Sequence, residues 1–206
     1  MKTLTNFNGV NKLLSIIMLT VILFGCSKDD EADKPIYPSS PESGLTKLTP
    51  VEQQGLLYMV EFEKMLADMY NLMSARTGSA VLKEIADTKT RHMFIIADQI
   101  DKYGVENPLS GRQIGEYKHP GFQKLYDDLK VSTPNSESTA IELGRQLENT
   151  LIRDLQFYLE SLHDHSDLIN MYNKIIEETK NGNVLLGPGF TGLEDIALPF
   201  DLVLEE

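Results

Sequence analysis

Two side chains able to do chemistry, Lys89 and His92, lie three residues apart in a stretch with helical periodicity. Residues three apart are neighbours on one face of an α-helix. Both fall inside the apolar face of that predicted helix, and burying a charge without a partner is costly. We therefore expect partners for them on neighbouring helices. The apolar residues that define this face are Val81, Ile85, Ala86, Met93, Ile96 and Ile100.

Two glutamates occupy matching positions on other predicted helices. Glu63 is the only charge in the middle of the apolar arc of a helix predicted from 50 to about 74. Glu148 lies near the centre of the apolar stripe of a helix predicted from 137 to 162, and Asp154 lies at the edge of that stripe. The opposite face of the first helix is expected to be solvated. That face carries Glu61, Lys64, Asp68 and Asn71.

Capping residues delimit these helices. Thr49 precedes Pro50, with Glu52 three residues after the cap, and Ser79 and Ser136 suit the caps of the second and third long helices. A short helix is predicted over 122–130 and a fourth long one over 166–181. The apolar side of this fourth long helix contains no carboxylate or histidine. The next residue that would fall on that side, beyond the predicted end of the helix, is Gly182. Since strand-like alternation is scarce, the pattern predicts an all-α fold.

The composition of the chain limits the classes of molecule that it could bind. The chain has 206 residues and a formal net charge of -12, which disfavours nucleic acid because a nucleic-acid partner needs a basic surface. A single cysteine, Cys26, excludes an intramolecular disulfide framework.

The N-terminus has the pattern of a lipoprotein signal peptide over residues 1–25. Lys2 and Lys12 are basic, and the apolar run 13–24 is shorter than the roughly 20 residues that span a bilayer. Cys26 follows Gly25 and resembles the lipid-bearing cysteine of a bacterial lipobox, which implies cleavage before Cys26 and its acylation, for example with palmitate. The alternative is an ordinary signal peptide with a chance cysteine.

Residues 27–31 place a lysine and three acids directly after that cysteine. This run resembles the lipoprotein export signal of Bacteroidetes, and the resemblance implies the outer membrane, facing outward. The alternative is a solvated charged linker. The sequence thus predicts a flexible acidic and Pro-rich tether over 26–48, a helical bundle over 49–182 and an irregular apolar tail over 183–206.

Inward Glu, His and Glu on three of four long helices are typical of a ferritin-like four-helix bundle, here with a short extra helix between helices two and three. Residues 48–181 resemble a bacterial ferritin-like family, domain of unknown function 2202 (DUF2202). The resemblance implies a metal centre at the inward ligands. The matching residues are Leu56 to Met59, Glu61, Glu63, Lys64, Asp68, Tyr70, Ile85, Ala86, Arg91 to Met93, Tyr103, Gly104, Leu125 to Leu129, Glu148, Asp154, Leu155 and Tyr172.

Three departures from that family reduce its ligand set. Lys89 stands where the family has the glutamate of Glu-x-x-His, Leu151 where it has an inward acid, and Gly182 where it has a histidine. Glu63, His92 and Glu148 remain. We hypothesise that the Lys89 ammonium pairs with Glu63 and Glu148 in the place of metal, because it would offset two buried carboxylates and repel a divalent cation.

Two functions compete at this point. One is a surface lipoprotein, without enzymatic activity, whose metal-free bundle serves as a scaffold or binding module for an unknown protein or small molecule. The other is a metal-binding protein or oxidoreductase that uses Glu63, His92 and Glu148 to hold iron, manganese or zinc. A second metal site is less favoured at 163–165, where His-Asp-His is better explained as a turn between helices.

Overall fold

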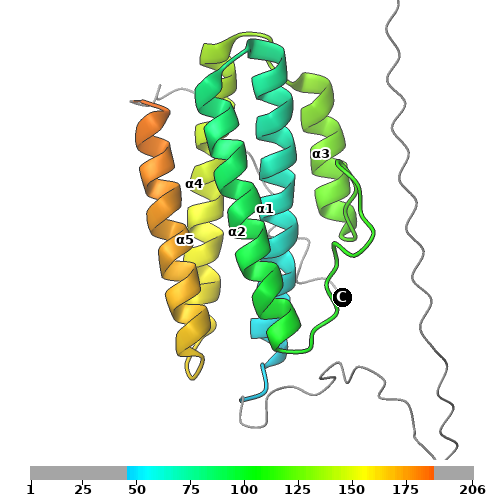
Figure 1. Cartoon of the computed structure of the whole chain (residues 1–206), viewed down its shortest axis with the longest axis vertical. Coiled ribbons are helices and arrows are strands. Elements are labelled where there is room, and N and C mark those ends of the chain that lie inside the picture. The colour runs from blue at the N-terminus through cyan, green and yellow to red at the C-terminus, as the bar shows by residue number, and fades with distance from the viewer. Residues whose placement is uncertain (1–45, 188–206) are drawn as a thin grey trace, which may run out of the picture. The chain divides into compact units, whose positions relative to one another are not determined.

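The computed structural model describes residues 46–187, and within them the fold is entirely helical, as predicted. Its helices are α1 (Pro50–Thr77), α2 (Ala80–Lys102), α3 (Pro120–Ser132), α4 (Glu137–Ser161) and α5 (Ser166–Leu185) (Figure 1). The predicted signal peptide, the Cys26 lipidation site, nearly all of the tether, and the tail from 188 onward lie outside the described residues. No helix between residues 46 and 187 is long and apolar enough to cross a membrane.

The start of α1 is fixed by the predicted capping residues. The Thr49 hydroxyl accepts a hydrogen bond from the Glu52 backbone N–H at 3.3 Å, and the Glu52 carboxylate accepts one from the Thr49 N–H at 2.7 Å. This reciprocal pair satisfies two N–H groups that have no partner within the helix. At the other end, Gly78 adopts a left-handed φ of 75° and lets the chain turn into α2.

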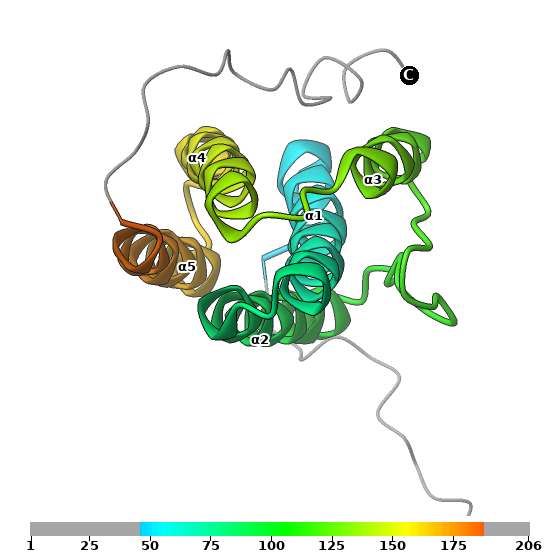
Figure 2. The same cartoon turned by 90° about the horizontal axis from the view of Figure 1, so that it is seen from above.

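The long helices α1, α2, α4 and α5 surround one core. Contacts join α1 to α2 and α4, and α5 to α4 and α2, which makes a ring of four helices, whereas α3 packs on α1 from outside this ring (Figure 2). Helix α1 contributes most of the large side chains that are fully buried, among them Phe62, Met65, Leu66 and Met69. Helix α1 is therefore covered on several sides, by α2 and α4 of the ring and by α3 outside it.

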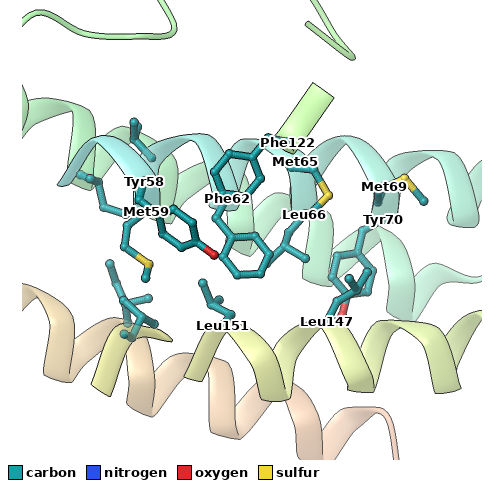
Figure 3. Packing of buried hydrophobic residues seen from close by; sticks show 14 of the residues in the cluster. Tyr58, Met59, Phe62, Met65, Leu66, Met69, Tyr70, Phe122, Leu147 and Leu151 are labelled. Atoms are coloured by element: carbon teal, nitrogen blue, oxygen red, sulfur yellow. The ribbon is translucent and has the colours of Figure 1, made fainter. Parts of the chain in front are cut away.

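Small residues allow α1 and α4 to approach closely. A Cβ atom added at Gly144 of α4 would lie 2.9 Å from the ring of Tyr70, and one at Gly55 of α1 would lie 2.7 Å from the ring of Tyr158. In Figure 3, Tyr70 points from α1 toward Leu147 of α4. The Tyr70 hydroxyl donates to the Gly144 carbonyl at 2.9 Å, so this contact also fixes the register of the two helices.

The face of α1 that was expected to be solvated is covered at Glu61 and Lys64, where the prediction was wrong, whereas Asp68 is partly exposed and Asn71 is exposed as predicted. Glu61 and Lys64 are buried. The loop between α2 and α3 folds over them: the His119 N–H donates to Glu61 at 3.1 Å, and the Lys64 ammonium donates to the Gln113 carbonyl at 2.8 Å. These charges serve as partners for loop backbone groups, and helical periodicity within α1 cannot reveal that role.

Helix α5 is longer than predicted. The sequence placed its end at Asn181 and the irregular tail from 183, but the helix continues through Gly182 to Leu185, and Gly187 follows with a φ of 77°. A glycine costs only about 1 kcal/mol inside a helix, so Gly182 does not end it. The turn predicted at 163–165 is present between α4 and α5.

Candidate functional site

Lys89 lies at the centre of the helical ring with 1% of its surface exposed. Its ammonium nitrogen is 2.6 Å from Oε2 of Glu148 on α4 and 3.8 Å from Oε2 of Glu63 on α1. It also donates to the Thr179 hydroxyl on α5 at 3.1 Å. One side chain of α2 thus contacts each of the other three helices in the ring.

His92 follows one helical turn after Lys89 and is fully buried. Its Nδ1 is 3.2 Å from Oε1 of Glu63, and its Nε2 is 2.9 Å from Oε2 of Glu178. A ring protonated on both nitrogens donates to both carboxylates, whereas a neutral ring donates to one. The imidazole therefore joins α1 to α5 through two acids.

Glu178 is the member of this site that the sequence reasoning missed. The side chain is partly exposed and receives a hydrogen bond from Arg91 at 2.8 Å in addition to its contact with His92. Partial burial would raise its pKa, but the hydrogen bonds from Arg91 and His92 prevail and hold the pKa below its ordinary value. One feature of the sequence could have indicated Glu178: it precedes Thr179 and lies at the border of the apolar side of α5.

Glu148 is 1% exposed and lies beside the Lys89 ammonium. Burial raises its pKa, although the nearby Lys89 ammonium acts in the opposite direction. The Tyr70 hydroxyl also lies close, but it donates its one hydrogen to the Gly144 carbonyl. Oε2 of Glu148 lies 2.6 Å from the Lys89 ammonium, whereas Oε1 has no hydrogen-bond partner within the described chain, and Oε2 of Glu63 lies 3.8 Å from the same ammonium.

We call Glu63, Lys89, His92, Glu148, Glu178 and Thr179 the central polar cluster. The structure brings together all four residues singled out by the sequence (Glu63, Lys89, His92 and Glu148). Among residues 46–187, no group of three or more His, Cys, Asp or Glu side chains has an arrangement that could hold a metal ion.

Two other predicted positions lie elsewhere. Asp154, expected at the edge of the α4 stripe, is fully buried and accepts a hydrogen bond from the Tyr58 hydroxyl at 2.8 Å. Of the His-Asp-His turn, only His165 is buried, where it contacts Tyr103 at 3.1 Å and Glu52 at 3.5 Å. Its two neighbours, His163 and Asp164, are exposed.

The chain belongs to the family described as "Uncharacterized protein domain (DUF2202)", which matches residues 52–183 and therefore includes the central polar cluster. This membership confirms the resemblance to DUF2202 noted in the sequence.

An archaeal relative is the uncharacterized protein MJ0754 of Methanocaldococcus jannaschii. It is 28% identical over 130 residues, which cover 63% of this chain and 70% of the relative. The crystal structure of hypothetical protein MJ0754 from Methanococcus jannaschii superimposes with a TM-score of 0.68 and 22% identity, covering 79% of this chain and 96% of the other. At that identity the likeness shows a shared fold and nothing of activity.

Proposed function

We propose that this protein is a surface lipoprotein whose ferritin-like domain has a lysine in the place of a metal centre and acts as a binding or scaffold module. The observation that carries the proposal is the contact of the Lys89 ammonium with Glu148 at 2.6 Å, inside a ring of four helices. Ferritin-like bundles use this interior position for inward carboxylates and histidines that hold metals.

The residues of the central polar cluster do not fit a divalent cation. Lys89 lies between the two carboxylates that would be the ligands, and its fixed positive charge would repel a metal there. The ammonium offsets carboxylate charge that would otherwise be buried without compensation. The chain itself therefore offsets part of the negative charge of its interior.

The location is proposed from the N-terminal sequence. Cleavage before Cys26 and its acylation would tether the domain to a membrane through residues 26–48, and the acidic run after Cys26 favours the outward face of the outer membrane. More than one acyl chain is needed for a stable anchor. Replacing Cys26 with Ser should abolish incorporation of labelled palmitate by the producing cells; incorporation that persists would contradict the lipid anchor.

Metal content tests the absence of a metal centre. The full chain, purified in a non-ionic detergent, would be loaded with iron, manganese or zinc, desalted and measured by elemental analysis. We expect no stoichiometric metal. Metal bound at one equivalent and lost in Glu63→Ala would replace the proposal with a mononuclear site.

A second candidate, such a metal site at Glu63, His92 and Glu148, is favoured by one observation. Oε1 of Glu148 is a buried acceptor without a hydrogen-bond partner in the described chain, and Oε2 of Glu63 has the Lys89 ammonium only at 3.8 Å, so a cation would satisfy both oxygens. Metal binding of this kind requires the Lys89 ammonium to leave its position. The unaltered protein should then bind stoichiometric metal, whereas the lysine-centred proposal predicts none in the unaltered protein and allows uptake only once the ammonium is removed, as in Lys89→Gln.

A further inference from the structure

A pocket with a volume of about 690 Å³ lies between the first half of α1 and the start of α3. Four residues of α1 line it at helical spacing and so form one stripe of that helix: Gln54, Leu57, Tyr58 and Glu61. Binding pockets in proteins typically have volumes of roughly 300–1,000 Å³. This pocket is therefore large enough to hold several side chains.

The wall of the pocket is largely apolar. Leu57 of α1 is partly exposed, and Pro108 and Pro120 contribute ring carbons from the loop before α3 and from the first turn of α3. The Tyr58 ring also lines the pocket, but its hydroxyl donates to Asp154 at 2.8 Å. An occupant must therefore cover apolar carbon atoms rather than bond to the Tyr58 hydroxyl.

Hydrogen-bond donors and basic groups lie at the edge of the pocket. His119 lines it, and the Nδ1 atom of His119 accepts a hydrogen bond from the Gly121 N–H at 3.1 Å. A neutral imidazole whose Nδ1 is an acceptor carries its proton on Nε2, which can donate to an anionic group. Lys118 and Lys124 line the pocket as well. Glu61 is 4% exposed, and its carboxylate already accepts the His119 N–H at 3.1 Å.

The two lysines are held only by exposed ion pairs. Lys118 lies 3.5 Å from Glu106, and Lys124 lies 2.6 Å from Asp128, with both members of each pair exposed. Exposed pairs of this kind contribute at most about 1 kcal/mol, so either lysine can turn to another carboxylate at little cost. The pocket therefore suits an apolar segment that carries acidic side chains.

The C-terminal sequence of this chain has that composition. Residues 188–206 are rich in apolar side chains, among them Phe190, Leu193, Ile196, Phe200 and Leu202. The same residues include no lysine or arginine and five acids, which are Glu194, Asp195, Asp201, Glu205 and Glu206. The segment thus matches the pocket in apolar character and has the opposite charge to the lysines at its edge.

The described chain ends within reach of the pocket. Arg145 of α4 donates to the carbonyls of Leu186 and Gly187 at 2.8 Å and 3.1 Å, so the segment starts beside the first half of α4. The pocket lies farther along α4, where Asp154 accepts the Tyr58 hydroxyl. The two positions on α4 are about 14 Å apart. A segment of this length spans up to roughly 60 Å when extended.

We propose that residues 188–206 dock in this pocket, with apolar side chains against Leu57 and the two prolines and acidic side chains near Lys118 and Lys124. A segment of the same chain is favoured over a separate peptide, because the covalent link gives it an effective concentration of the order of millimolar. The inference goes beyond the proposed function and does not depend on it, since neither Lys89 nor a metal takes part.

Amide hydrogen exchange of the full chain in detergent, followed by mass spectrometry, tests this docking. A synthetic peptide with the sequence of residues 188–206 gives the unprotected rates. We expect amides of this segment to exchange more slowly in the full chain than in the peptide, by about tenfold or more. Leu57→Asp places a charge in the apolar wall and should restore the rates of the peptide. Phe94→Asp, at a side chain of α2 that is 60% exposed, should leave exchange slow.

Lys124→Glu tests the charge at the edge of the pocket without changing the core. It should reduce the protection of residues 188–206 by about two- to fivefold. Lys83→Glu is the matched control, because Lys83 forms an equally exposed pair with Asp87, four residues further along α2. Lys83→Glu should leave the protection unchanged. Exchange within α4 should match the parent in every variant, which shows that the bundle is intact.

Three outcomes would overturn the proposal. The first is exchange of residues 188–206 at the rates of the free peptide. The second is slow exchange that persists in both Leu57→Asp and Lys124→Glu. The third is fast exchange of the segment with protection of residues 54–61 that increases with protein concentration, which would assign the pocket to a second copy of the chain. All three leave the proposed function standing.

Discussion

The ammonium of Lys89 lies 2.6 Å from Oε2 of Glu148, and both side chains are almost completely withdrawn from solvent. Burying an ion pair does not by itself stabilise a fold, since desolvation offsets much of the attraction. Removing one partner is far more costly, because the other charge is then left without compensation. Because of this asymmetry, removing one partner should change the free energy of unfolding measurably. The same reasoning applies to the neighbouring charged and polar side chains.

The contact between His92 and Glu178 predicts a specific dependence of stability on pH. The pKa of Glu178 is lowered from its ordinary value of 4.5, so its charged form contributes stability above pH 4.5 that is lost as the pH falls through the lowered value of the folded state. Glu178→Gln should therefore be less stable than the parent at neutral pH, with a difference that shrinks on acidification. Denaturant unfolding at a series of pH values measures this.

Glu177→Gln is the matched control, since Glu177 is the exposed neighbour of Glu178 on the same helix. It should show no such difference at any pH. A Glu178→Gln variant that tracks the parent at all pH values would mean that the contacts of Glu178 with Arg91 and His92 do not stabilise the charged acid.

The close approach of α1 and α4 predicts a cost for a single methyl group. Gly144→Ala places a Cβ 2.9 Å from the Tyr70 ring, which is held by its hydrogen bond to the Gly144 carbonyl. We expect a loss of about 1–3 kcal/mol in the free energy of unfolding. Gly182→Ala, where the Cβ meets open space, should instead stabilise α5 by about 0.5–1 kcal/mol. Equal effects of the two changes would contradict this packing.

The buried Asp154 predicts that the Tyr58 hydroxyl is important for stability. Tyr58→Phe removes the 2.8 Å hydrogen bond and leaves a fully buried carboxylate whose remaining partner among residues 46–187 is Arg153, at 3.1 Å. The expected loss is about 1–3 kcal/mol by chemical unfolding. Tyr103→Phe, which removes a hydrogen bond to the partly exposed Asp167, should cost at most about 1 kcal/mol. If Tyr58→Phe cost less stability than Tyr103→Phe, the buried Asp154 carboxylate would not depend on the Tyr58 hydroxyl as its hydrogen-bond donor.

Much of the helical fold could be predicted because its determinants are local. The capping pair of Thr49 and Glu52 and the left-handed Gly78 act within a few residues of the helix ends that they fix. Helical periodicity likewise decides which side chains face inward, so Glu63, Lys89, His92 and Glu148 could be placed near the interior before any contact was known.

The remaining features depend on contacts that periodicity does not encode. Glu178 lies at the border of the apolar side of α5, and its side chain reaches His92 only because α2 and α5 pack together. Lys64 has the spacing of a solvated residue, yet the loop before α3 covers it and uses it as a donor to the Gln113 carbonyl. Both outcomes follow from long-range packing.

The account's central claim is that Lys89 compensates the buried carboxylates of Glu63 and Glu148. The most direct measurement is the free energy of unfolding of Lys89→Met, with Lys83→Met as control because Lys83 pairs with Asp87 on the exposed side of the same helix. We expect a loss of about 3–5 kcal/mol for Lys89→Met and a change within about 0.5 kcal/mol for Lys83→Met. Unchanged stability in Lys89→Met, with both carboxylates still buried, would contradict the claim.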